Sequence, residues 1–117
     1  MSAITTHVLD TARGRPAAGV HVRLEFQTGG REGDPWKILG EGATDPGGRL
    51  RNLLPPGALL TEGIYRLTFD TANYFRAQKE SAFYPEVKVT FFVADGAQHY
   101  HVPLLLSPFG YSTYRGS

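Results

Sequence analysis

A β-hairpin near the end of the chain is the feature that most restricts how this sequence can fold. Two runs rich in Val, Leu, Tyr and Thr flank the four residues SPFG at 107–110. Proline in the second position and glycine in the fourth are typical of a type I turn. Antiparallel pairing across such a turn places Leu105 opposite Ser112, and His101 opposite Gly116.

The same pairing predicts which side chains share one face of the hairpin. It places Pro103 opposite Tyr114, and side chains alternate between the two faces of a strand with a period of two. His101 and Tyr114 are therefore expected near each other and near the final stretch, Arg115 to Ser117. Chain ends are usually frayed and expendable, so an end held in a sheet beside a histidine indicates a functional site.

Strand-like segments recur along the rest of the chain with turn residues between them, which is typical of an all-β sandwich. The stretch Thr71 to Lys79 is rich in Ala, Arg, Gln and Lys and is predicted to form one short helix. We expect a single domain over residues 1–117, a two-sheet β-sandwich of about eight strands. The expected strands are Ile4 to Leu9, Val20 to Gln27, Trp36 to Thr44, Ile64 to Asp70, Val87 to Val93 and the two arms of the hairpin.

The pattern of residue types also predicts which side chains are buried. Apolar and polar residues alternate over 20–27, so the apolar set is expected to face the core. Trp36 is expected in the core as well. Phe91 and Phe92 are adjacent and point to opposite faces, so a partner subunit is expected to cover apolar surface here. The inward set is Val20, Val22, Leu24 and Phe26, and the outward set is His21, Arg23, Glu25 and Gln27.

The segment DPGG at 45–48 is predicted to form a type II turn, because proline occupies its second position and glycine its third. Arg49 leaves this turn directly. On local grounds, an arginine in that place is usually an exposed residue at the start of a strand.

Composition excludes several classes of function. The net charge is +1, and the lysines and arginines are scattered, so no nucleic-acid surface is expected. The chain has no cysteine and therefore no thiol nucleophile or disulfide. No apolar run is long enough for a membrane span, and the first residues lack the apolar core of a signal peptide. We expect a cytoplasmic protein.

Four basic residues are candidates for chemistry: His7, Arg49, His101 and Arg115. Histidine exchanges a proton near neutral pH, and the forked donors of arginine can hold a planar anion or a developing oxyanion. This combination suits the activation of water against an electron-poor carbonyl of an anionic heterocycle. The signal is weak when it is taken alone.

The remaining histidines have simpler interpretations. His21 and His99 are expected to be solvated or hydrogen-bonded residues of strands. His99 and His101 lie on one strand face and could bind zinc, but the sequence shows no third ligand, so no metal is expected.

Three segments resemble a known family: ITTHVLDTARGRPAAGV near the start, TDPGGR in the middle and HYHVPLLLSPFGYSTYRGS at the end. They are similar to the transthyretin-related 5-hydroxyisourate hydrolases of purine catabolism. Transthyretin itself resembles the LLSPFGYST part but lacks the histidine of HVP and the YRGS segment. The resemblance implies a transthyretin-like sandwich of two four-stranded sheets, assembled as a homotetramer with active sites in a central channel.

The resemblance also implies the site residues and the reaction. His7, Arg49 and His101 would form the catalytic centre, closed by Tyr114, Arg115, Gly116 and Ser117. Ser117 would assist catalysis, and His7, Arg49, Tyr114, Arg115 and Gly116 would bind substrate. The family reaction adds water to 5-hydroxyisourate and opens its six-membered ring, giving 2-oxo-4-hydroxy-4-carboxy-5-ureidoimidazoline, without a cofactor. Which histidine is the general base stays open at this point.

Two other functions compete with the hydrolase. The first is a non-catalytic transthyretin-like protein that binds a small aromatic ligand in the same channel. Such a carrier needs apolar walls, whereas the residues expected to face the channel include His101 and Tyr114. The second is a structural β-sandwich module of a larger surface protein, for which a linker or secretion signal would be expected.

Overall fold

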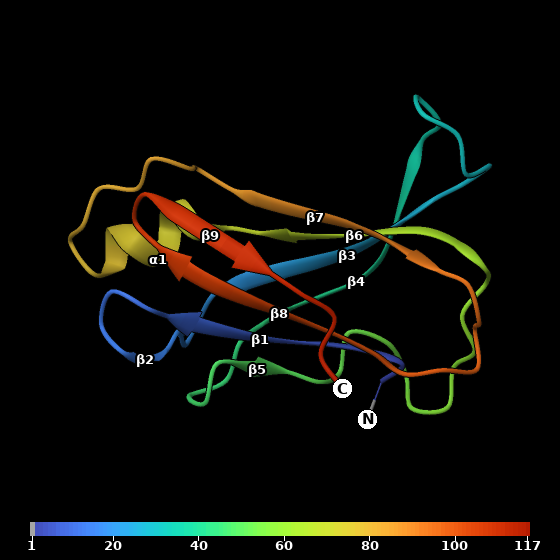
Figure 1. Ribbon diagram of the computed structural model, residues 1–117, viewed down its shortest axis with the longest axis horizontal. Coiled ribbons are helices and arrows are strands. Elements are labelled where there is room, and N and C mark those ends of the chain that lie inside the picture. The colour runs from blue at the N-terminus through green and yellow to red at the C-terminus, as the bar shows by residue number, and fades with distance from the viewer. Residues whose placement is uncertain (1) are drawn as a thin grey trace.

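The computed structural model describes residues 2–117, which form two β-sheets packed face to face with one short helix at one end (Figure 1). The all-β sandwich expected from the sequence is confirmed. The first sheet has the order β2-β1-β8-β9, with β5 also paired to β1. Its strands are β1 (Ile4–Asp10), β2 (Arg15–Pro16), β5 (Arg49–Leu50), β8 (Tyr100–Ser107) and β9 (Gly110–Thr113).

The second sheet has four strands in the order β4-β3-β6-β7. The expected strand boundaries hold to within a residue or so in both sheets. The resemblance implied four strands in each sheet, but the two-residue strands β2 and β5 both lie along β1, so the first sheet has five. The elements of this half are β3 (His21–Gln27), β4 (Trp36–Ala43), β6 (Gly63–Phe69), α1 (Thr71–Ala77) and β7 (Val87–Val93).

Two pairings in the first sheet bring the ends of the chain together. β1 and β8 are parallel, from Ile4 opposite Tyr100 onwards. The hairpin of β8 and β9 has the expected register, with Leu105 opposite Ser112. Beyond the strands, His101 and Gly116 form the expected isolated antiparallel bridge. The two termini therefore lie close together at one edge of the sandwich (Figure 1).

The core fills the space between the two sheets and is built from alternate residues of each long strand. Val22 and Leu24 point inward as expected and are fully buried. On β1 and β8 the even-numbered residues face the core, so the odd-numbered residues of both strands face away from it. The largest buried side chains are Tyr65, Phe69, Phe75, Ile4, Leu24, Leu67, Leu104 and Leu106.

Three expectations about burial in the second sheet are wrong. Glu25 and Gln27 were expected to face solvent, yet they are only 5% and 7% exposed. Glu25 does point away from the core, but Arg66 donates two hydrogen bonds to its carboxylate and Thr68 donates a third, so these side chains cover it. Trp36 is not in the core, because its ring lies on the outer face, 4.0 Å from the Arg66 guanidinium carbon.

Helix α1 begins after Asp70, whose carboxylate accepts a hydrogen bond from the backbone N–H of Asn73. It ends two residues earlier than expected, before Lys79, which has a positive φ of 59°. Its Tyr74 hydroxyl donates a 2.7 Å hydrogen bond to the buried carboxylate of Asp10 on β1. No helix in residues 2–117 has the length and apolar character needed to cross a bilayer.

Replacing Tyr74 with Phe should lower the free energy of unfolding by about 2 kcal/mol, because it removes a donor from a buried carboxylate. Burial and the bond to Asp10 raise the pKa of Tyr74, so its hydroxyl stays protonated as a donor across the usual pH range. Urea unfolding measures the change. Tyr84→Phe is the matched control, since that side chain is 36% exposed. Equal stability of the two variants would contradict the assignment.

Candidate active site

The candidate site lies on the outer face of the first sheet. His7 on β1 and His101 on β8 are odd-numbered residues and so point away from the core. Arg49 on β5 lies directly opposite His7, and Thr5 lies opposite His101. Three strands that are distant in sequence thus place two imidazoles and a guanidinium on one surface.

The turn before Arg49 differs from the expected type. A type II turn would give Gly47 the positive φ, but it is Gly48 that has a φ of 79°. A side chain at Gly48 would place its Cβ 2.4 Å from the carbonyl oxygen of Val8, so only glycine fits this close to β1. The Asp45 carboxylate accepts bonds from the backbone N–H groups of Gly47 and Arg49.

These backbone hydrogen bonds, that from Arg49 most strongly, lower the pKa of Asp45 below its ordinary value. The carboxylate therefore stays ionised and holds the turn. His7 also contacts the turn, since its Nε2 lies 2.9 Å from the carbonyl oxygen of Gly47. A carbonyl oxygen can only accept, so Nε2 of His7 carries the proton. The backbone of the turn at Arg49 is thus held by both Asp45 and His7.

A pocket of about 300 Å³ opens on this face beside His101. Every residue that lines it is polar, and the set includes two of the three residues predicted as its catalytic centre. His7 lies next to the pocket, bonded to the turn that carries Arg49. The lining residues are Thr5, Thr6, Arg49, Arg51, His99, His101 and Ser117.

The tail after β9 returns over His101. The backbone N–H of Gly116 donates a 2.8 Å hydrogen bond to the carbonyl oxygen of His101. A Cβ at Gly116 would lie 2.6 Å from Cδ2 of the His101 ring, so the tail approaches this closely only because Gly116 has no side chain. Ser117 then reaches the pocket wall.

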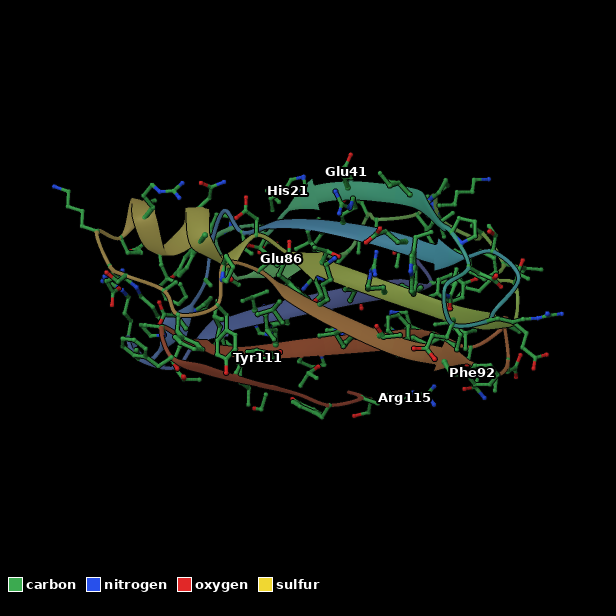
Figure 2. The ribbon with its side chains drawn as sticks, turned by 90° about the horizontal axis from the view of Figure 1, so that it is seen from above. His21, Glu41, Glu86, Phe92, Tyr111 and Arg115 are labelled. Atoms are coloured by element: carbon green, nitrogen blue, oxygen red, sulfur yellow. The ribbon has the colours of Figure 1, made fainter. Side chains whose placement is uncertain are left out.

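Tyr114 and Arg115 do not line this pocket. They line a separate hollow of about 240 Å³ at the edge where β7 and β9 lie, together with Phe92. The Arg115 guanidinium stacks on the Tyr100 ring at 4.4 Å and donates a hydrogen bond to Gln98. Figure 2 looks onto this edge and shows Arg115 and Phe92 toward the same end of it. The side chain of Tyr114 is 57% exposed.

Sequence reasoning missed four residues of the pocket: Thr5, Thr6, Arg51 and His99. Thr5, Arg51 and His99 each stand two positions from a predicted site residue, on the same strand or its extension, and side chains two apart share a face. That spacing was the available signal. Arg51 adds a second guanidinium to the pocket, and the Thr5 hydroxyl lies 2.8 Å from Nδ1 of His101.

The surroundings of His101 favour its neutral form. Burial lowers the pKa of His101 below its ordinary value, and the positive charges of its neighbours lower it further. These neighbours are His99, His7, Arg49 and Arg51. A neutral imidazole with an unprotonated nitrogen is a proton acceptor, so His101 is suited to act as a general base at neutral pH.

His99 and His101, the pair that the sequence offered for zinc, make other contacts. The rings of His99 and His101 lie parallel, with centroids 6.4 Å apart, and both bond to the Thr5 hydroxyl. No group of three or more metal-ligating side chains occurs in residues 2–117.

Comparison with known proteins places this chain in one family. The model of the HIUase/Transthyretin family matches residues 4–116, and the chain belongs to this family. A 5-hydroxyisourate hydrolase of Caulobacter vibrioides is 46% identical over 121 aligned positions, covering 100% of both chains.

Solved structures show that this fold serves two kinds of protein. The 5-hydroxyisourate hydrolase of Klebsiella pneumoniae superposes with a TM-score of 0.81 and 34% identity, over 97% of this chain and 98% of that one. Sea bream transthyretin in complex with thyroxine superposes with a TM-score of 0.87 and 31% identity, over 98% and 95%. The backbone alone therefore does not distinguish an enzyme from a hormone carrier, and the site residues must do so.

An NMR titration of the His101 ring protons should have its midpoint below about 6.5, the ordinary histidine value. Arg51→Gln should move that midpoint upward, because it removes one positive charge that opposes protonation of the ring. Arg31→Gln, a change in the exposed loop between β3 and β4, is the control and should not move it. A midpoint above the ordinary value would refute this account of the site.

Proposed function

We propose that the protein hydrolyses 5-hydroxyisourate at the pocket on the outer face of the first sheet. The observation that carries this proposal is that His101, whose surroundings lower its pKa, lines one small pocket with Arg49 and Arg51. A base and fixed cations together suit water attack on a carbonyl of an anionic ring. Relatives that are named 5-hydroxyisourate hydrolases and match nearly the whole chain support the substrate.

In this proposal His101 is the general base. Its Nδ1 is bonded to Thr5, and no side chain in residues 2–117 bonds to its Nε2, which is free to accept a proton from water. The hydroxide adds to the amide carbonyl, and Arg49 stabilises the negative charge that develops on oxygen. The carbon–nitrogen bond then breaks, the nitrogen takes back the proton, and the six-membered ring opens to the carboxylated ureidoimidazoline.

The other predicted residues have supporting roles. His7 keeps its proton on Nε2, so Nδ1 of the neutral ring is an acceptor for a substrate N–H. Ser117 positions substrate or water from the pocket wall. Gly116 permits the close approach of the tail. Arg115 holds the tail at the sheet edge through Tyr100 and Gln98, and Tyr114 lines the hollow there. Substrate binding by Tyr114 and Arg115 stays a prediction from the sequence.

The competing carrier function fits this pocket less well. A site for an apolar aromatic ligand is lined mainly by hydrophobic side chains. The pocket beside His101 is instead lined by threonines, arginines, histidines and a serine. The shared fold is compatible with both functions, so the residues that line the pocket decide in favour of the hydrolase.

We infer that the protein assembles as a homotetramer. β7 and β9 are unpaired edges on the same side of the sandwich (Figure 1). Large apolar side chains are exposed along them: Phe92 is 54%, Tyr111 43% and Tyr114 57% exposed. A partner subunit at this edge would cover both the strands and the hollow between them. The cytoplasmic location stays a prediction from the sequence.

Replacing His101 with Asn should reduce kcat by about 100-fold or more, because it removes the proton acceptor and nearly preserves the volume. The ultraviolet decay of freshly prepared 5-hydroxyisourate measures the rate above the uncatalysed background. His21→Asn is the matched control, since Figure 2 shows His21 beside Glu41 on the opposite sheet. Near wild-type turnover of the His101 variant would end the assignment of the general base.

Deleting Tyr114 to Ser117 should abolish catalysis and leave a folded oligomer, because the core and β9 are complete at Thr113. The truncated and full-length proteins are compared for substrate decay, thermal melting and mass by light scattering. A tetramer has the mass of four chains of 12.8 kDa. Unchanged turnover would show that the tail is not part of the site, and a collapsed melting temperature would show that it is structural.

A further inference from the structure

The hydroxyl of Thr5 stands between two imidazoles at the edge of the pocket. Its Oγ1 lies 2.8 Å from Nδ1 of His101 and 3.1 Å from Nε2 of His99. Thr5 is 2% exposed, and these two ring nitrogens are the partners of its hydroxyl within residues 2–117. His99 is exposed to solvent, whereas His101 is half-buried.

The number of protons restricts how these three groups can bond. A hydroxyl has one proton to donate and can accept two hydrogen bonds. A ring nitrogen that lacks a proton needs a donor, and one that carries a proton needs an acceptor. The hydroxyl can therefore serve one unprotonated nitrogen, and the other nitrogen facing it must carry a proton. The proton positions on His99 and His101 are coupled through Thr5.

We propose that His99, acting through the Thr5 hydroxyl, is a positioning residue that sets which nitrogen of His101 carries the proton. When Nε2 of His99 is unprotonated, the hydroxyl donates to it and accepts from Nδ1–H of His101. The proton of neutral His101 is then on Nδ1, and its Nε2 is free to take a proton from water. This step rests on the proposed hydrolase function, since it prepares His101 as the base.

The same bond serves His101 throughout the reaction. After Nε2 accepts a proton from water, Nδ1–H still donates to the Thr5 hydroxyl, now from a charged ring, which strengthens the hydrogen bond. No side chain has to move between the two states. The Thr5 hydroxyl thus accepts from Nδ1–H and orients the ring, which is the role of the aspartate in a Ser-His-Asp triad.

Protonation of His99 reverses the arrangement. Its Nε2–H then donates to the hydroxyl, and the hydroxyl proton turns toward Nδ1 of His101, because a buried donor without an acceptor is costly. Neutral His101 then carries its proton on Nε2 and cannot accept one from water. His99 is exposed to solvent, so its ring can exchange protons directly with the medium.

The charged neighbours of His101 favour its neutral form. His7 on β1, and Arg49 and Arg51 on and after β5, are positive or can become so, and they oppose protonation of His101. On the other side of His99, the segments at 57–59 and 96–98 line a hollow with it and contain no charged residue. His99 is therefore the titratable group that bonds to Thr5 from the solvent side.

The first test reads the proton position directly, in protein without substrate. Histidine-selective nitrogen-15 labelling distinguishes a protonated from an unprotonated ring nitrogen by chemical shift. Neutral His101 in the wild type should carry its proton on Nδ1. Thr5→Val, which removes the hydroxyl at nearly constant volume, should shift the population toward Nε2–H, and Thr5→Ser should restore the wild-type pattern. A population that is the same in all three proteins would overturn the proposal.

The second test is the pH dependence of kcat. In the wild type both His99 and His101 must be neutral, so kcat should fall about 100-fold per pH unit at the acid extreme. His99→Gln should reduce this to about tenfold per unit, because one ionisation is lost. His21→Gln, on the opposite sheet, is the control and should keep the wild-type profile (Figure 2). An unchanged slope in His99→Gln would contradict the coupling.

The two tests separate this inference from the proposed function. Failure of the wild type to hydrolyse 5-hydroxyisourate would remove the function, whereas the nitrogen shifts would still report the coupling. If Thr5→Val does not fold, as its melting curve would show, His99→Gln provides the same comparison of His101 shifts at low pH. Acid conditions should move the His101 proton to Nε2 in the wild type and leave it on Nδ1 in His99→Gln, and any other pattern counts against the proposal.

Discussion

The parallel pairing of β1 with β8 is the constraint on which the rest of this structure depends. It joins residues near the two ends of the chain and runs without a shift from Ile4 opposite Tyr100 to Asp10 opposite Leu106. A parallel pair needs a long crossover connection, and here the crossover contains the entire second sheet. Once this register is set, Thr5 lies opposite His101, and His7 and His101 share the outer face, where Arg49 and the tail then pair with them.

The first sheet uses its two faces for different purposes. On its inner face Val8 and Leu104 are fully buried, which fixes the register because a slip of one residue would expose them. On its outer face, buried Thr5 lies beside the imidazoles of His99 and His101. The hydrophobic core therefore positions the polar site with a precision that the site residues could not supply by themselves, because a flat polar face specifies register weakly.

Much of this arrangement could be predicted from the sequence, and the failures have physical causes. The hairpin register was correct because a tight turn fixes the pairing of its strands, and it brought Gly116 to His101 as expected. Glu25 was misplaced because alternation gives the face of a residue but not what covers it, and Arg66 covers it. The turn before Arg49 was mistaken because the left-handed position is set by contact with β1, which local preferences do not contain.

The candidate site was predicted less completely than the fold, for a related reason. Strand parity in the hairpin placed His101 beside the end of the chain, and the family resemblance placed His7 with it. Parity does not extend past the end of β9, where the tail follows its own contacts. There Arg115 turns to the Tyr100 ring, away from the pocket. A fold that superposes on both a hydrolase and a transthyretin in complex with thyroxine leaves function to such contacts. In the proposed mechanism, this face is suited to catalysis by the hydrogen bond that Nδ1–H of His101 donates to the Thr5 hydroxyl, because that bond leaves Nε2 of the ring free to accept a proton.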